Sequence, residues 1–120
     1  MMNLYRQNIL DHYHHPRNAG ELKDVDCKIS LDNPLCGDLI AVTVKLSGDQ
    51  IKAIKYQAIG CAVSIAAMSM LSEKAKDQSV AEVQSWGEKE ILEMLGIEVS
   101  ATRLKCAMLG LRTLQKCLNK

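Results

Sequence analysis

The chain has 120 residues, of which 48% are hydrophobic and 24% charged, a size and composition that suit one compact globular domain and leave no room for a second core. Its 15 Lys and Arg residues nearly balance its 14 Asp and Glu residues, and the net charge of +1 argues against the basic patch that nucleic acids and anionic membranes require. Aromatic residues make up only 3% of the chain, which disfavours stacking platforms for bases. We therefore expect a single domain over residues 1–120 with neither a nucleic-acid nor a membrane partner.

The first predicted element is a helix over residues 3–14. Apolar residues recur at helical spacing across it, and Pro16 stops the pattern because proline cannot continue a helix. Tyr5 and Tyr13 belong to this pattern, and we expect them to pack the helix against a sheet. The opening is polar, without an apolar signal segment, and no run approaches the roughly 18 apolar residues of a membrane span. The expected location is therefore cytoplasmic.

Three strands are predicted next. Residues 27–31 alternate between apolar and polar as a half-buried strand does, and residues 39–46 form a second strand rich in Val and Ile. Residues 47–49 (Ser-Gly-Asp) are a turn signal, and a third strand follows over residues 51–59. Strands joined this closely pair in opposite directions, so the sheet is predicted to be antiparallel.

Several helices are predicted after the sheet. Small residues in the segment 62–71 would let that helix lie close to the sheet, and Ser79 caps a short helix. Residues 88–95 form another short helix that Gly96 ends, and residues 102–118 form the last one. The predicted fold class is α+β, a three-stranded antiparallel sheet with an N-terminal helix and a C-terminal set of helices packed on it.

The chain has five cysteines, an odd number. In a reducing compartment the default for each is a buried small hydrophobe or a reactive or metal-binding thiol, so we expect no disulfide framework. Cys27 falls on the inward register of the first strand and is most simply a core residue. Cys117 lies eleven residues beyond Cys106, about 16 Å along the last helix, too far to share a site with it. Three candidate ligands remain, Cys36, Cys61 and Cys106.

Cys36 and Asp38 lie two residues apart in a loop that begins with Pro34. Backbone freedom at Gly37 could let the Cys36 thiolate and the Asp38 carboxylate converge on one ion. The alternative is a turn in which Asp38 caps backbone N–H groups and Cys36 is buried. This segment alone leaves both interpretations open.

Cys61 and Cys106 both fall near a predicted helix start. Cys61 follows Gly60 at a strand-to-helix junction, where free N–H groups favour a thiolate, although a core cysteine on an Ala-rich face would look the same. Cys106 lies beside Lys105, whose ammonium would favour a thiolate and could reach an anionic ligand, unless it is simply a solvated surface group. Together with the loop thiol and carboxylate, these two thiols could supply four ligands to one zinc or iron–sulfur site.

The three histidines, His12, His14 and His15, could suggest a zinc site, but neighbouring positions point apart on a helix. A histidine near a helix C-terminus is favoured by the helix dipole without any metal. We therefore interpret them as non-ligands. The sequence contains no nucleophile elbow, phosphate-binding loop or dinucleotide fingerprint, so thiolate chemistry is the favoured interpretation.

Taken together, several segments resemble the U-type iron–sulfur scaffold family, which includes IscU, SufU and the N-terminal domain of NifU. The segments are Leu4-Tyr5-Arg6-Gln7, Asp11-His12-Tyr13, Pro16-Arg17-Asn18, Asn33-Pro34-Leu35-Cys36-Gly37-Asp38, Gly60-Cys61-Ala62 and Arg103-Leu104-Lys105-Cys106-Ala107. Each is weakly specific alone, but the ordered set is strongly specific and covers nearly the whole chain.

The resemblance implies a SufE/NifU-like scaffold that accepts sulfur from a cysteine desulfurase of the IscS, SufS or NifS type. It also implies that a [2Fe–2S] cluster is assembled and handed to apo iron–sulfur recipient proteins. The three cysteines of the family fall on Cys36, Cys61 and Cys106, and its ligand-site aspartate falls on Asp38. One cysteine first accepts persulfide sulfur, Cys36 by similarity to SufU or Cys106 by similarity to IscU. Two copies could also share a cluster as a homodimer.

The chain lies between two branches of this family. IscU members usually carry His before the third cysteine, whereas this chain has Lys105 in an R-x-K-C sequence that resembles SufU. SufU members typically have an insertion between the second and third cysteines, and the short path from Cys61 to Cys106 resembles IscU instead. The SufU-like features support an alternative, a zinc-dependent sulfurtransferase in which the same four residues hold zinc and Cys36 leaves the metal to collect sulfur.

Overall fold

The computed structural model describes residues 4–34 and 37–119, so the predicted ligand Cys36 lies outside the described residues. The helices are α1 (Leu4–His14), α2 (Ala62–Ala75), α3 (Val80–Gln84), α4 (Glu88–Leu95) and α5 (Ala101–Leu118). The strands are β1 (Cys27–Asn33), β2 (Asp38–Ser47) and β3 (Gln50–Ile59). The predicted element order and the α+β class are confirmed. Within the described ranges, no helix combines the length and apolar character that crossing a membrane would require.

The sheet has β2 at its centre and is antiparallel throughout, as predicted. At one end of the sheet, Asn33 pairs with Asp38, and Leu39 pairs with Ile59. This register places the first residues of β2 beside the last residues of both neighbouring strands. The loop between β1 and β2 and the connection from β3 to α2 therefore both lie at this end of the sheet.

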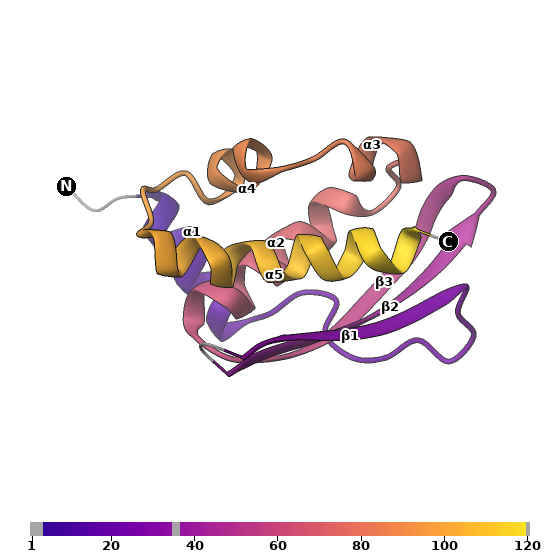
Figure 1. The fold of residues 1–120 in the computed structure, drawn as a ribbon, viewed down its shortest axis with the longest axis horizontal. Coiled ribbons are helices and arrows are strands. Elements are labelled where there is room, and N and C mark those ends of the chain that lie inside the picture. Colours follow the sequence, from indigo (N-terminus) through magenta and orange to yellow (C-terminus); the bar gives the residue numbers. More distant parts are fainter. Residues whose placement is uncertain (1–3, 35–36, 120) are drawn as a thin grey trace.

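The helices α2 and α5 lie on one face of the sheet, with α3 and α4 beyond them (Figure 1). The sheet contributes Ile40, Val42 and Val44 to the core, all fully buried. The two helices approach closely where Gly110 of α5 faces Met68 of α2, because a Cβ at Gly110 would lie only 2.8 Å from the Met68 sulfur. Close helix packing thus fixes α5, which carries Cys106, relative to α2.

The helix α1 packs mainly against α2, and the expectation that Tyr5 and Tyr13 pack it against the sheet was wrong. It lies against α2, burying Ile9 and His12, while Tyr5 is 54% exposed and Tyr13 38% exposed. The ring of Tyr5 instead lies against Gly96, which follows α4. The reason is that α2 and α5 already cover the inner face of the sheet, so α1 must form a further layer.

A disulfide joins Cys27 at the start of β1 to Cys117 in the last turn of α5, contrary to the expectation of two separate core cysteines. Their Cα atoms are 5.7 Å apart, a typical separation for a disulfide. The two residues are 90 positions apart in the sequence, and only the packing of α5 along β1 brings them together. Cysteine spacing alone could not predict this pairing.

Removing this crosslink should lower the free energy of unfolding. In the chain-entropy model, a bond across 90 residues stabilises the folded state by about 4–5 kcal/mol because it restricts the unfolded chain. Urea unfolding should therefore show a loss approaching that size in the double variant Cys27→Ser/Cys117→Ser relative to the oxidised wild type. A reductant should lower the stability of the wild type but leave the variant unchanged. Equal stability of the oxidised and reduced wild type would contradict the crosslink.

Candidate metal centre

Three of the predicted site residues converge at one end of the sheet. Asp38 is the first residue of β2, Cys61 follows β3, and Cys106 lies in α5. One carboxylate oxygen and the two Sγ atoms all lie within 4.8 Å of one another. Figure 1 shows the start of β2, the end of β3 and the first turns of α2 and α5 at this same end of the molecule. The fourth predicted residue, Cys36, lies outside the described residues, two positions before Asp38.

This centre is buried on one side and open on the other. Asp38 is 1% exposed and Cys106 is 3% exposed, whereas Cys61 is half-buried. Burial of a carboxylate is costly unless it is hydrogen-bonded. The backbone N–H of Cys61 donates to Oδ1 of Asp38 at 3.1 Å and offsets part of that cost. Solvent therefore reaches the centre from the side on which Cys61 lies.

The position of Cys61 at a helix start is confirmed. Its backbone is extended (φ −75°, ψ 166°), and its carbonyl accepts the first helical bond, from the N–H of Ile65 at 3.1 Å. The opening turn of α2 has N–H groups without helical partners, and negative charge is favoured there. The Asp38 carboxylate therefore lies where the helix stabilises it.

Cys106 and its neighbour Lys105 point to different environments on α5. Ser100 caps this helix by accepting a hydrogen bond from the N–H of Arg103 at 3.2 Å. The following turn buries Cys106 but leaves Lys105 exposed. Lys105 lines a shallow groove of about 260 Å³ with Asp32, Asn33, Pro34, Leu109 and Arg112. Lys105 is therefore next to Cys106 in sequence but faces solvent on α5, and the groove that it lines contains none of the three converging residues.

The donor set fits a thiophilic metal or an iron–sulfur cluster. Thiolates favour zinc and iron–sulfur clusters, and a carboxylate oxygen is a harder ligand that both accept. Around a single zinc ion, sulfurs at about 2.3 Å from the metal lie about 3.8 Å apart. The observed spread of up to 4.8 Å would need only a small contraction. Cys36 is the nearest candidate in sequence for a fourth ligand.

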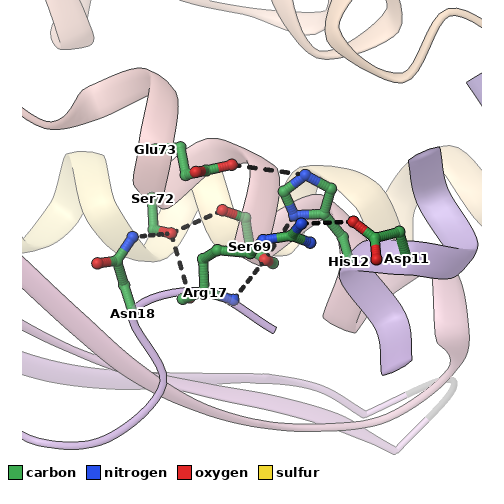
Figure 2. Close-up of polar contacts among 7 residues, drawn as sticks. All are labelled: Asp11, His12, Arg17, Asn18, Ser69, Ser72 and Glu73. Atoms are coloured by element: carbon green, nitrogen blue, oxygen red, sulfur yellow. Dashed lines mark hydrogen bonds and ion pairs between the residues drawn. The ribbon is translucent and has the colours of Figure 1, made fainter. Parts of the chain in front are cut away.

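A second group of polar residues joins α1 and the segment after it to α2. We call it the α1–α2 polar cluster, and it consists of Asp11, His12, Arg17, Asn18, Ser69, Ser72 and Glu73 (Figure 2). His12 is only 5% exposed, and the helix-dipole argument used for the three histidines did not predict this burial. Its Nδ1 lies 2.7 Å from Oγ of Ser69, and its Nε2 lies 3.5 Å from Oε1 of Glu73. These partners are 57 and 61 residues away along the chain, so helical spacing gave no signal of them.

The cluster also fixes the segment after α1 between α2 and β3. The N–H of Arg17 donates to Oγ of Ser69 at 2.9 Å, and the Asn18 side chain donates to Oγ of Ser72 at 3.0 Å. On the other side, the N–H of Tyr56 in β3 donates to the carbonyl of Asn18 at 3.2 Å. This segment therefore links the two elements that the Gly60–Cys61 junction connects.

Burial and hydrogen bonding shift the pKa values of two residues in this cluster. Desolvation lowers the pKa of His12, although the nearby Glu73 carboxylate opposes that shift. The hydrogen bond from the Arg17 guanidinium holds the pKa of Asp11 below its usual value. With His12 neutral, the Ser69 hydroxyl can accept the N–H of Arg17 and donate its own proton to Nδ1. The ring then presents its Nε2–H to Glu73.

Known proteins resemble this chain over nearly its whole length. The family model described as NifU-like N terminal domain matches residues 4–120. The iron-sulfur cluster assembly scaffold protein IscU 1 of Archaeoglobus fulgidus is 32% identical over 96% of this chain and 74% of the relative. The zinc-dependent sulfurtransferase SufU of Bacillus subtilis is 33% identical over 98% of this chain and 90% of the relative. The crystal structure of a NifU-like protein (N-terminal) from Brucella abortus has the same fold, with a TM-score of 0.79, 16% identity and coverage of 95% and 91% of the two chains.

Acidification should weaken the fold through His12. An unfolded histidine has a pKa of about 6.5, and burial lowers the folded value, so the unfolded chain binds more protons once the pH falls below about 6.5. The stability that neutral His12 contributes is therefore present above that pH and is lost progressively below it. Urea unfolding at about pH 7.5 and about pH 5.5 should show a smaller loss for His12→Gln than for the wild type. The exposed His14→Gln variant should keep the wild-type loss, and an unchanged loss in His12→Gln would contradict this role.

Proposed function

The chain belongs to the family of NifU-like N-terminal domains, and from this we propose that it is an iron–sulfur cluster assembly scaffold. In this proposal residues 1–120 act as one domain that accepts sulfur from a cysteine desulfurase, assembles a [2Fe–2S] cluster and transfers it to apo-proteins. The observation that carries the proposal is the convergence of one carboxylate and two thiols within 4.8 Å. The cluster is cargo, so the protein needs a centre that both binds and releases it.

Each ligand has a role in this proposal. Cys36, Cys61 and Cys106 bind iron as thiolates, and Asp38 completes the site as an oxygen ligand. Thiolate is the better partner for an iron–sulfur cluster, so one oxygen ligand suits a cluster that must leave. The half-buried side chain of Cys61 supports transfer from the accessible side of the centre.

Sulfur arrives by thiol–persulfide exchange. A scaffold thiolate attacks the outer sulfur of the desulfurase persulfide, the S–S bond of the donor breaks, and the donor leaves as a thiolate. Because Cys106 is only 3% exposed, we favour Cys36 as the first acceptor. Reducing two such sulfur atoms to sulfide takes four electrons. Two ferrous ions supply two of them on becoming ferric, and an external thiol or protein reductant supplies the other two.

The second candidate function is zinc-dependent sulfur transfer. It is favoured by the similarity to the Bacillus subtilis relative, which carries that activity in its name, and by a donor set that suits zinc. Here zinc would be held by the same four residues, Cys36, Asp38, Cys61 and Cys106. Cys36 would leave the metal to accept sulfur and pass it on, with no cluster stored.

Anaerobic reconstitution distinguishes the two functions. Metal-free protein is incubated with ferrous iron, cysteine and a desulfurase, and absorption and Mössbauer spectra are recorded. We expect the wild type to show a [2Fe–2S] spectrum and to transfer its cluster to an apo-ferredoxin. The spectrum should be lost in Cys36→Ser, Cys61→Ser and Cys106→Ser. Cys117→Ser, studied under reducing conditions, is the matched control and should keep the cluster. If no cluster forms, and zinc instead accelerates the desulfurase in a way that Cys36→Ser abolishes, sulfur transfer is the function.

A further inference from the structure

We propose that Gly60 is a positioning residue for the metal centre. Because it has no side chain, the Asp38 carboxylate can lie across the junction between β3 and α2, where the N–H of Cys61 holds it within reach of the two thiols. The inference rests on the proposed function, since it assigns a role to a residue that offers no ligand atom itself.

Contact between Gly60 and Asp38 is the first observation. A Cβ built on Gly60 would overlap Oδ1 of Asp38 and would lie 2.7 Å from its Cγ and 3.1 Å from its Cβ. Real Cβ atoms do not approach other atoms this closely, so one of the two groups would have to move. The backbone of Asp38 is paired with Asn33 in the sheet, so the side chain of Asp38 is the part of this residue that would move. An alanine at position 60 would therefore displace the carboxylate.

The hydrogen bond at this junction is the second observation. The N–H of Cys61 donates to Oδ1 of Asp38, and the Cys61 side chain makes no capping hydrogen bond of its own. The same residue thus supplies a thiol through its side chain and orients the carboxylate through its backbone. A carboxylate displaced from Cys61 would lose this bond in a buried position, where the loss of a hydrogen bond to a charged group is costly.

The backbone of Gly60 supplies a separate constraint. Its φ of +153° lies in the region that favours glycine. An alanine there would be strained even without the collision with Asp38. An experiment must therefore separate the effect of backbone strain from that of carboxylate displacement. Substitution of Asp38 does this, because it removes the carboxylate and leaves the strain.

Cobalt(II) titration of the anaerobic, reduced protein tests the proposal. The sulfur-to-cobalt charge-transfer bands report thiolate ligation, and the d–d bands report the whole ligand set. Loss of a group that orients a ligand typically weakens metal binding about 10–100-fold, which we expect for Gly60→Ala relative to the wild type. Asp38→Ala should show a similar spectrum. The double variant Gly60→Ala/Asp38→Ala should bind no more weakly than Asp38→Ala alone, because Gly60 acts through Asp38.

Gly48→Ala is the matched control for a substitution at positive φ. Gly48 has φ +63°, lies in the turn between β2 and β3, and has no atom within 4 Å of a Cβ built on it. This variant carries backbone strain without a collision, far from the centre. It should keep the cobalt affinity and spectrum of the wild type.

Amide exchange in the metal-free protein gives a second measurement that does not involve the metal. The Cys61 amide should exchange faster in Gly60→Ala and Asp38→Ala, because each loses the acceptor. Asp38→Asn should keep its protection, since an amide oxygen still accepts a hydrogen bond. If Gly60→Ala fails to fold while the double variant folds, the collision itself is demonstrated and the proposal is supported.

Three outcomes would overturn the proposal. The first is a Gly60→Ala variant that binds cobalt as tightly as the wild type. The second is a double variant in which Gly60→Ala weakens cobalt binding by the same factor as it does in the wild type, because this would identify backbone strain as the cause. Both leave the proposed function intact. The third is a wild-type protein that shows no thiolate bands from Cys61 and Cys106, in which case the metal centre and the role of Gly60 fall together.

Discussion

The contact between the Asp38 carboxylate and the N–H of Cys61 is the constraint on which the rest of the metal centre depends. A carboxylate that is 1% exposed requires a donor, and the start of α2 offers one in a favourable electrostatic position. The register of the sheet brings Asp38 to this point by pairing Leu39 with Ile59 directly before the junction. The close approach of α2 and α5 then adds Cys106. Three elements thus meet around a single hydrogen bond.

The α1–α2 polar cluster supports the same junction from the other side. Asn18 contacts Ser72 in α2 through its side chain and Tyr56 in β3 through its carbonyl, so it links both elements that flank Cys61. The buried side chain of His12 adds a contact between α1 and α2, because its Nδ1 lies 2.7 Å from Oγ of Ser69. The orientation of α2, and with it the thiol of Cys61, therefore depends on residues that lie well outside the metal centre.

Local sequence patterns predicted the elements well because the periodicity of apolar residues and the turn residues at Gly48 and Gly96 are short-range signals. They also pointed to Asp38, Cys61 and Cys106, which the structure brings together, while the ligand roles of these residues stay predictions. What local patterns missed depends on contacts between distant segments. The disulfide, the burial of His12 and the exposure of Tyr5 all follow from which helix covers which surface. Which helix covers which surface depends on the packing of the whole chain, so a segment of about ten residues cannot predict it.

The crosslink between β1 and α5 also divides the sulfur atoms of the molecule into two groups. Of the five cysteines in the chain, two are consumed by the bond between Cys27 and Cys117, which leaves Cys36, Cys61 and Cys106. Within the part of the chain that the structure describes, the cysteines outside the disulfide are Cys61 and Cys106, and both belong to the proposed centre. Sulfur that a persulfide delivers to a free thiol among the described residues of this form is therefore sulfur bound at the centre.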